Sequence, residues 1–190
     1  MAAYKKRLPS TEELLDLAKK VHAESARLGI PSAVLGGLAM NLYGSARLTK
    51  DVDFVSDRLI DPPPAGLSPM RKIAFGGEVY GTDRGIDVDW IVREDHYAGL
   101  YREALLGATT EMEDLPVVGI EFLAAIKFAA SVRNPKHYDD LLFLLVHPDI
   151  DLTKTKNIVF KHVGGAFGVE QLEAAIDEAV WRKGSSEGRP

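Results

Sequence analysis

The sequence contains no cysteine among its 190 residues, which excludes disulfide bonds, thiolate nucleophiles and cysteine-based zinc sites. It also lacks any run of about 18 apolar residues, so we expect no membrane-spanning helix. Residues 1–10 carry charge with no apolar segment behind them, which argues against a secretory signal. The formal net charge is −5, so no overall positive field favours nucleic acid. Together with 46% hydrophobic residues, these absences indicate a folded, soluble and cytoplasmic protein.

Several motifs of common enzyme classes are missing as well. The five histidines show neither HxxxH nor HExxH spacing, which argues against a zinc enzyme. Neither GxxxxGK[ST] nor GxGxxG occurs, so the P-loop and dinucleotide-binding classes are excluded.

The apolar pattern predicts a mixed α/β part up to about residue 118. A capping box from Ser10 to Glu13 begins a helix that continues to about Leu28. The remaining predicted elements of this part are strands at 32–35, 51–55, 72–80 and 86–92, a short helix at 38–43, a loop at 57–70, a turn at 81–85, a helix at 94–106 and an edge-like segment at 116–118.

A helical part follows this mixed part. Apolar residues from Ile120 onward predict one helix, which Pro135 ends. Further helices are predicted at 138–146, 154–162 and 169–181. The expected domains are therefore an α/β core at 1–118, a helical bundle at 119–183 and a flexible tail at 184–190.

Two pairs of aspartates are the most informative feature of the sequence. Asp51 and Asp53 alternate with an apolar residue, and so do Asp87 and Asp89, so each pair projects to one side of a strand. Neighbouring carboxylates repel by about 1 kcal/mol at ~4 Å in water and by about 4 kcal/mol at an intermediate dielectric constant. A single such pair is most often a solvent-facing strand position. Two pairs, the first preceded by a glycine pair and an Arg-x-Thr, favour a two-metal site for phosphoryl or nucleotidyl transfer, with Mg²⁺ on carboxylate oxygens.

The order of these motifs resembles the nucleotidyltransferase superfamily of the DNA polymerase β type. More narrowly, it is similar to the AbiEii/MenT-type nucleotidyltransferases, which are often the toxins of bacterial toxin–antitoxin pairs. The resemblance covers roughly residues 30–146 and implies an α+β fold, with a small mixed sheet flanked by helices and then a C-terminal helical part. It rests on these segments: Gly36-Gly37, Arg47-x-Thr49-x-Asp51-Val52-Asp53, Gly85-Ile86-Asp87-Val88-Asp89, Leu115 to Lys127, and Lys136 to Leu142.

The resemblance implies that Asp51, Asp53 and Asp89 are catalytic and hold two Mg²⁺ ions, with Mn²⁺ as the alternative metal. Asp87 shares the strand face of Asp89 and is the alternative third carboxylate. Lys127 is a further implied catalytic residue near the nucleotide phosphates; otherwise it extends from an apolar helix toward solvent.

The remaining implied residues bind the nucleotide. Gly36 and Gly37 would let the backbone approach the triphosphate, since neither carries a Cβ atom. Arg47 either contacts the triphosphate or pairs with a nearby aspartate, and Thr49 is either a ligand or a turn cap. The superfamily has Gly-Ser where this chain has Gly-Gly, so a hydroxyl on the phosphate would come from Ser45 or Thr49.

In the helical part, the resemblance implies that Asp140 closes the next conserved helical motif and lies at the nucleotide. Its neighbour Asp139 is the less favoured match. The sequence there is locally basic, which indicates either phosphate contacts or an ordinary solvated face. The basic residues are Arg133, Lys136, His137, Lys154, Lys156, Lys161 and His162.

The expected function is transfer of a nucleoside monophosphate from an NTP to an acceptor hydroxyl, with release of pyrophosphate. By resemblance, the acceptor is an RNA, most often a tRNA 3′ end, the outcome is growth inhibition, and a cognate antitoxin protein is the partner. Two alternatives remain open: an aminoglycoside-type enzyme that modifies a small hydroxylated molecule, and an inactive nucleotide-binding or interaction module.

Overall fold

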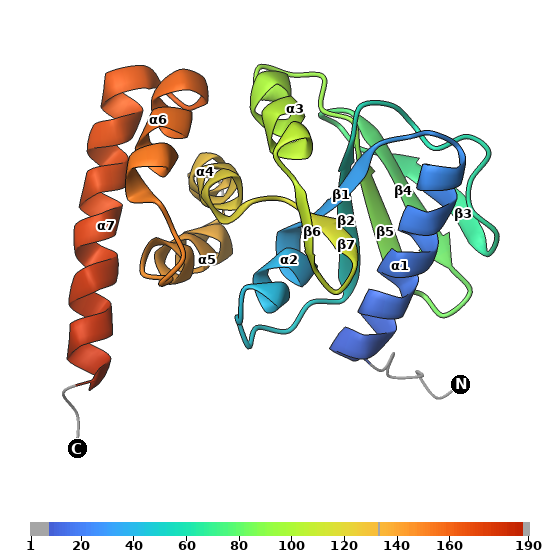
Figure 1. The fold of residues 1–190 in the computed structure, drawn as a ribbon, viewed down its shortest axis with the longest axis horizontal. Coiled ribbons are helices and arrows are strands. Elements are labelled where there is room, and N and C mark those ends of the chain that lie inside the picture. Colours follow the sequence, from blue (N-terminus) through green and yellow to red (C-terminus); the bar gives the residue numbers. More distant parts are fainter. Residues whose placement is uncertain (1–7, 133, 188–190) are drawn as a thin grey trace, which may run out of the picture. The chain divides into compact units, whose positions relative to one another are not determined.

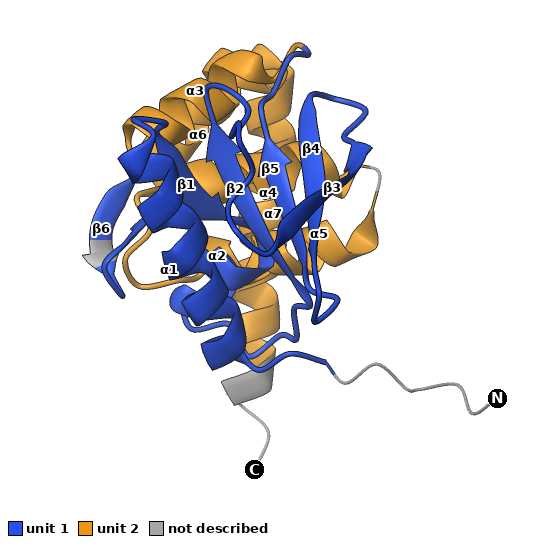
Figure 2. Cartoon of the chain, turned by 90° about the vertical axis from the view of Figure 1, so that its right-hand side faces the viewer, with its two compact units in different colours: residues 1–95, 108–117 blue, residues 96–107, 118–190 orange. Residues whose placement is uncertain are grey.

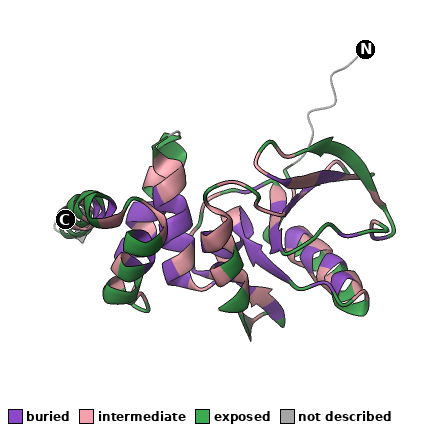
Figure 3. Cartoon of the chain, turned by 90° about the horizontal axis from the view of Figure 1, so that it is seen from above, coloured by how far each residue is buried: buried purple, intermediate pink, exposed green. Residues whose placement is uncertain are grey.

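The computed structural model describes residues 8–132 and 134–187. The chain divides into two compact units (Figure 2). Unit 1 consists of Met1–Asp95 and Ala108–Val117, and unit 2 consists of His96–Gly107 and Val118–Pro190. Buried residues concentrate inside each unit, on the strands and on the inner faces of the helices (Figure 3).

The described part of unit 1 is built on a seven-stranded sheet with the order β3-β4-β5-β2-β1-β7-β6 (Figure 1). The pairs β2/β5 and β1/β7 are parallel and the other neighbours are antiparallel. The sheet is therefore mixed, as expected. Its strands are β1 (Ser32–Leu35), β2 (Asp51–Ser56), β3 (Leu67–Lys72), β4 (Gly77–Thr82), β5 (Asp87–Ile91), β6 (Thr109–Met112) and β7 (Leu115–Val117).

Two helices of unit 1 pack on this sheet. In α1 (Thr11–Arg27), the predicted capping box is present: the Glu13 N–H donates to Ser10 Oγ, and the Ser10 N–H donates to the Glu13 carboxylate. The buried stripe of α1 contains Leu14, Ala18 and Val21, and the helix contacts β1, β2 and β7. The short α2 (Gly36–Leu42) follows β1 directly and contacts β1 and β2.

Unit 2 is helical in its described residues. Its helices are α3 (Ala98–Leu106), α4 (Ile120–Ser131), α5 (Pro135–Leu145), α6 (Leu152–His162) and α7 (Gly165–Glu187). The central α4 is buried on nearly all sides because α3, α5 and α6 all contact it. No helix of the described residues is both long and apolar enough to cross a membrane.

The expected fold class, a mixed sheet with flanking helices and a further helical part, is confirmed, but several elements differ from prediction. The expected loop at 57–70 and strand at 72–80 are wrong in part, because β3 begins at Leu67 and a turn separates it from β4. Pro69 hid this strand, yet proline is tolerated on an edge strand, and the pairing shifts register between Pro69 and Arg71. The segment at 116–118 is not an edge, since β6 lies outside β7.

Several helix boundaries also differ. Helix α5 begins at Pro135 rather than at 138, because proline fits the first helical position and the Asn134 side chain caps the helix by accepting from the Lys136 N–H. Helix α3 begins at Ala98 rather than at 94. Helix α7 continues through Gly184 to Glu187, and residues 188–190 of the expected tail lie outside the described residues.

Candidate active site

The four aspartates gather on one face of the sheet because β2 and β5 are parallel neighbours in register. Asp51 pairs with Asp87, and Asp53 pairs with Asp89. Paired residues on adjacent strands point to the same face. All four side chains are half-buried, whereas Val52, which lies between two of them, is fully buried on the other face. The pairing thus assembles a cluster that the chain separates by more than thirty residues.

The glycine pair adjoins this cluster. Leu35 at the end of β1 pairs with Asp53, and Gly36 follows with a φ of +67°, a conformation that favours glycine. A Cβ atom on Gly36 would overlap the Asp53 carboxylate, and one on Gly37 would overlap the Thr49 hydroxyl. The two glycines are therefore needed for β2 and its preceding segment to approach the start of α2.

Hydrogen bonds fix the positions of the first two carboxylates. Thr49 Oγ1 donates to Asp51 Oδ1 at 2.9 Å, and the Gly37 N–H donates to Asp53 Oδ2 at 3.4 Å. The loop that leads to Thr49 is held by Asn41, whose Nδ2 donates to the Arg47 carbonyl oxygen at 2.8 Å. The buried Thr49 therefore orients the Asp51 carboxylate. Arg47, in the same loop, is half-buried.

Burial and neighbouring charges both act on the Asp89 carboxylate. Burial raises the pKa of Asp89, and the negative charge of Asp51 raises it further. The nearby charges of Arg71 and Lys50 act in the opposite direction, and that of Asp87 adds to the increase. A cation bound among these carboxylates would relieve this repulsion.

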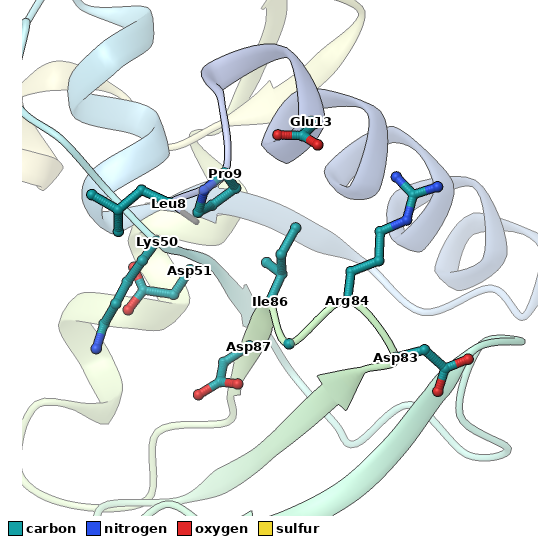
Figure 4. A pocket seen from close by; sticks show the side chains of 10 residues that line it. Leu8, Pro9, Glu13, Lys50, Asp51, Asp83, Arg84, Ile86 and Asp87 are labelled. Atoms are coloured by element: carbon teal, nitrogen blue, oxygen red, sulfur yellow. The ribbon is translucent and has the colours of Figure 1, made fainter. Parts of the chain in front are cut away.

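An open cleft of about 710 Å³ lies beside Asp51 and Asp87, the first residues of β2 and β5 (Figure 4). Asp51 and Asp87 face it from neighbouring strands, together with Lys50 and Arg84. Acidic residues outnumber basic ones in its lining, because Glu13 and Asp83 also line it. Asp53 and Asp89 are not among its lining residues.

A metal ion fits the donor chemistry of the cluster, although no ready-made cage is present. Among residues 8–132 and 134–187, no three His, Asp or Glu side chains form a group that could hold a metal ion. Mg²⁺, however, is commonly held by one or two carboxylates, with waters and substrate phosphates in its other positions. Asp51, Asp53 and Asp89 offer such oxygens on one face.

Lys127 and Asp140 lie in unit 2 and contact each other. Lys127 Nζ donates to Asp140 Oδ2 at 2.7 Å between α4 and α5, and both side chains are buried, with 4% and 6% exposed. The interpretation of Lys127 as a side chain that extends into solvent is wrong, because its ammonium is inside the unit. Asp139, the less favoured match, is exposed and pairs with Arg182.

The predicted basic residues of unit 2 are largely balanced by local carboxylates. Lys154 pairs with Glu121, Lys156 with Glu173 and Lys161 with Glu103, at 3.1, 2.8 and 2.6 Å. His162 also contacts Glu103. Arg133 lies outside the described residues.

Sequence reasoning missed Arg71 as a site residue. Arg71 pairs with Val79 of β4, which in turn pairs with Asp89 of β5. The three residues therefore belong to one row of the sheet, and the charge of Arg71 acts on Asp89. Only recognition of β3 as a strand would have revealed this, and Pro69 concealed it.

No protein-family model and no curated protein matches the sequence. Among solved structures, an antigenic nucleotidyltransferase-like protein from Paracoccidioides brasiliensis is 16% identical, with a TM-score of 0.50 over 88% of this chain and 94% of that one. The antibiotic-resistance factor ANT(2″)-Ia is similar in its solution structure (15% identity, TM-score 0.49, 94% and 98% covered) and in its complex with adenylyl-2″-tobramycin (19%, 0.45, 89% and 98%). The likeness to the Paracoccidioides brasiliensis protein, at 16% identity, is one of fold. The chain therefore has a nucleotidyltransferase-like fold.

Proposed function

We propose that this protein is a metal-dependent nucleotidyltransferase that moves a nucleoside monophosphate from an NTP to the 3′ hydroxyl of an RNA. The observation that carries the proposal is the alignment of Asp51 with Asp87 and of Asp53 with Asp89, next to the glycine turn at Gly36. A carboxylate cluster of this kind, on a sheet of this fold, suits chemistry in which negative charge is concentrated at a phosphate.

In the proposed reaction, the oxygen of the acceptor hydroxyl attacks the α-phosphorus. The bond between the α-phosphorus and the bridging oxygen breaks, and pyrophosphate leaves with the electron pair. The hydroxyl proton passes to a carboxylate, for which Asp89 is the candidate because it lies beside Asp53 on the same face of the sheet. Asp87 is the alternative acceptor of this proton, since it faces the cleft.

Asp51, Asp53 and Asp89 would hold Mg²⁺ or Mn²⁺. When bound, the metal would supply positive charge to the attacking and leaving oxygens. Thr49 would keep the Asp51 carboxylate in place through its 2.9 Å hydrogen bond, and Gly36 and Gly37 would leave room for the triphosphate as well as for Asp53. Arg47 remains a proposed triphosphate contact. Lys127 and Asp140 remain proposed nucleotide-site residues. In the structure, the two side chains are hydrogen-bonded to each other.

The finer assignment rests on the sequence resemblance alone. We propose that the chain is an AbiEii/MenT-type toxin that modifies tRNA 3′ ends in the cytoplasm and is opposed by a cognate antitoxin protein. The motif order from Gly36-Gly37 to Asp89 supports it.

The proposed activity is tested with purified protein, Mg²⁺, total bacterial tRNA and each NTP labelled at its α-phosphate. Labelled tRNA on a denaturing gel is the expected result with at least one NTP. In Asp53→Asn, labelling should fall by roughly a hundredfold or more, the loss typical when a group that stabilises transition-state charge is removed. Asp57→Asn is the matched control, because Asp57 follows the same strand but is exposed and paired with Arg58. Absence of labelled RNA with every NTP would contradict the RNA assignment.

A small cationic acceptor is the second candidate. The observation that favours it is the cleft beside Asp51, whose lining includes four acidic residues and two basic ones, Lys50 and Arg84. Such a lining attracts amines. An aminoglycoside added in place of tRNA would then yield a labelled small product, and that product would depend on Asp53 in the same way.

A further inference from the structure

One row of paired residues crosses the sheet at the carboxylates. From β1 to β3 it consists of Leu35, Asp53, Asp89, Val79 and Arg71. The glycine turn follows Leu35 directly, so this turn lies at one end of the row and the arginine at the other, with both carboxylates between them. A nucleotide and an acceptor substrate that both reach these carboxylates would therefore lie near opposite ends of the row.

Arg71 is available for a ligand. Its side chain is exposed, and it makes no hydrogen bond or ion pair with any residue in the part of the chain that the structure describes. It is nevertheless close enough to the carboxylates for its charge to act on Asp89. Its neighbour Lys72 pairs with Glu78 of β4 and so projects to the opposite face of the sheet.

We propose that Arg71 binds a phosphate group of the acceptor, and that the acceptor is consequently an RNA strand rather than an amine-rich small molecule. This inference rests on the proposed function, which leaves the glycine end of the row to the triphosphate. A cluster of four carboxylates repels a polyanionic strand, and a guanidinium at the acceptor end offsets that repulsion. Its planar donor fork matches two phosphate oxygens at once. A cationic acceptor would instead be repelled at this position.

The test is a fluorescence-anisotropy titration of a labelled single-stranded RNA, in parallel with a fluorescent non-hydrolysable NTP analogue. Arg71→Ala should weaken RNA binding by about tenfold, the value of one charged hydrogen-bonded contact. The slope of log affinity against log salt should become shallower by about 0.7, as expected for one phosphate contact on a single strand. NTP binding should not change.

Two further variants separate the phosphate contact from a general charge effect. Lys72→Ala is the matched control, since it removes the same charge from the next residue of β3 but from the other face, and it should leave RNA binding unchanged. Arg71→Lys should restore the salt slope but only part of the affinity, because a lysine cannot bind two oxygens in a fixed plane. Thermal unfolding should be nearly identical for all variants, since both side chains are exposed.

The possible results fall into distinct groups. Equal RNA affinity and slope for Arg71→Ala and the unmodified protein would overturn the proposal. So would a protein that binds the NTP analogue but no RNA, and the cationic acceptor would then be preferred. Absence of NTP binding would contradict the proposed function instead, while the RNA titration would still decide whether Arg71 contacts phosphate.

Discussion

Gly36 shows how a single residue without a side chain can determine the geometry of the site. Its φ of +67° and its closeness to the Asp53 carboxylate impose separate requirements for glycine. Gly44 has a φ of +85° but nothing within 4 Å of the position of a Cβ atom. Substitutions at these two glycines therefore distinguish the effect of backbone strain from the effect of displacing the Asp53 carboxylate.

We expect Gly36→Ala and Gly44→Ala to have different effects on activity. Gly44→Ala should lose about 1–2 kcal/mol of unfolding free energy, because an L-residue is strained in this backbone region. Gly36→Ala should lose more, because its methyl group also overlaps the Asp53 side chain. Only Gly36→Ala should also lose nucleotide transfer, by about tenfold or more, since its methyl group must displace Asp53. Urea unfolding and the tRNA-labelling assay measure the two quantities. Similar activity losses in both variants would show that strain, and not the carboxylate, is responsible.

The aspartates of the candidate site were predictable because acidic residues alternate there with apolar ones, as on a strand with one buried face. Asp51, Asp53, Asp87 and Asp89 stand out because each pair alternates with a buried residue. The contacts of the glycines were not predictable, since Asp53 is seventeen residues from Gly36 and only the antiparallel pairing of β1 and β2 brings them together. Arg71 was missed for a similar reason: its role depends on two successive strand pairings.

At the scale of elements, strands and helices with a buried face were predicted and those without one were not. In β3, five of the six residues are exposed, so no alternation marks it. The short β6 has no apolar alternation either and was missed. By contrast, α1 and α4 are marked by apolar residues at helical spacing, and both occur where expected, although α4 ends at Ser131, ahead of the Pro135 that was expected to end it.

The ion pair between α4 and α5 gives a prediction at this scale. Replacing Lys127 alone by Met, or Asp140 alone by Leu, should cost about 3–5 kcal/mol of unfolding free energy, because each removes an oppositely charged side chain that contacts a buried charge at 2.7 Å. The double variant should recover much of that loss. Urea unfolding of the four proteins completes a double-mutant cycle.

The exposed pair Lys156–Glu173 on α6 and α7 is the comparison, and its removal should cost at most about 1 kcal/mol. If the Lys127 and Asp140 losses simply add in the double variant, the pair is not a coupled structural contact. A double variant that is stable but inactive would support the proposed role of these residues at the nucleotide.

At the scale of the whole molecule, composition is a weak guide to where RNA would bind. The basic residues of the second half suggest an RNA surface in the sequence, but in the structure Lys154, Lys156 and Lys161 each contact a glutamate. The glutamates beside these lysines reduce the positive potential that a phosphate would meet there. Arg71, on β3 of unit 1, has no such partner among the described residues.

We therefore expect the triple substitution of Lys154, Lys156 and Lys161 by Ala to leave RNA affinity within about twofold of the unmodified protein. The salt slope should also stay unchanged. If these lysines did bind three phosphates, the slope would become shallower by about 2 and affinity would fall by orders of magnitude. The same anisotropy titration as for Arg71 measures both quantities. Thermal unfolding measures the loss of stability, which includes the pair of Lys154 with the buried Glu121 as well as two exposed pairs of small value. A large loss of affinity in the triple variant with no loss in Arg71→Ala would transfer the RNA surface to unit 2, and would leave the acidic face of unit 1 to the nucleotide and to catalysis.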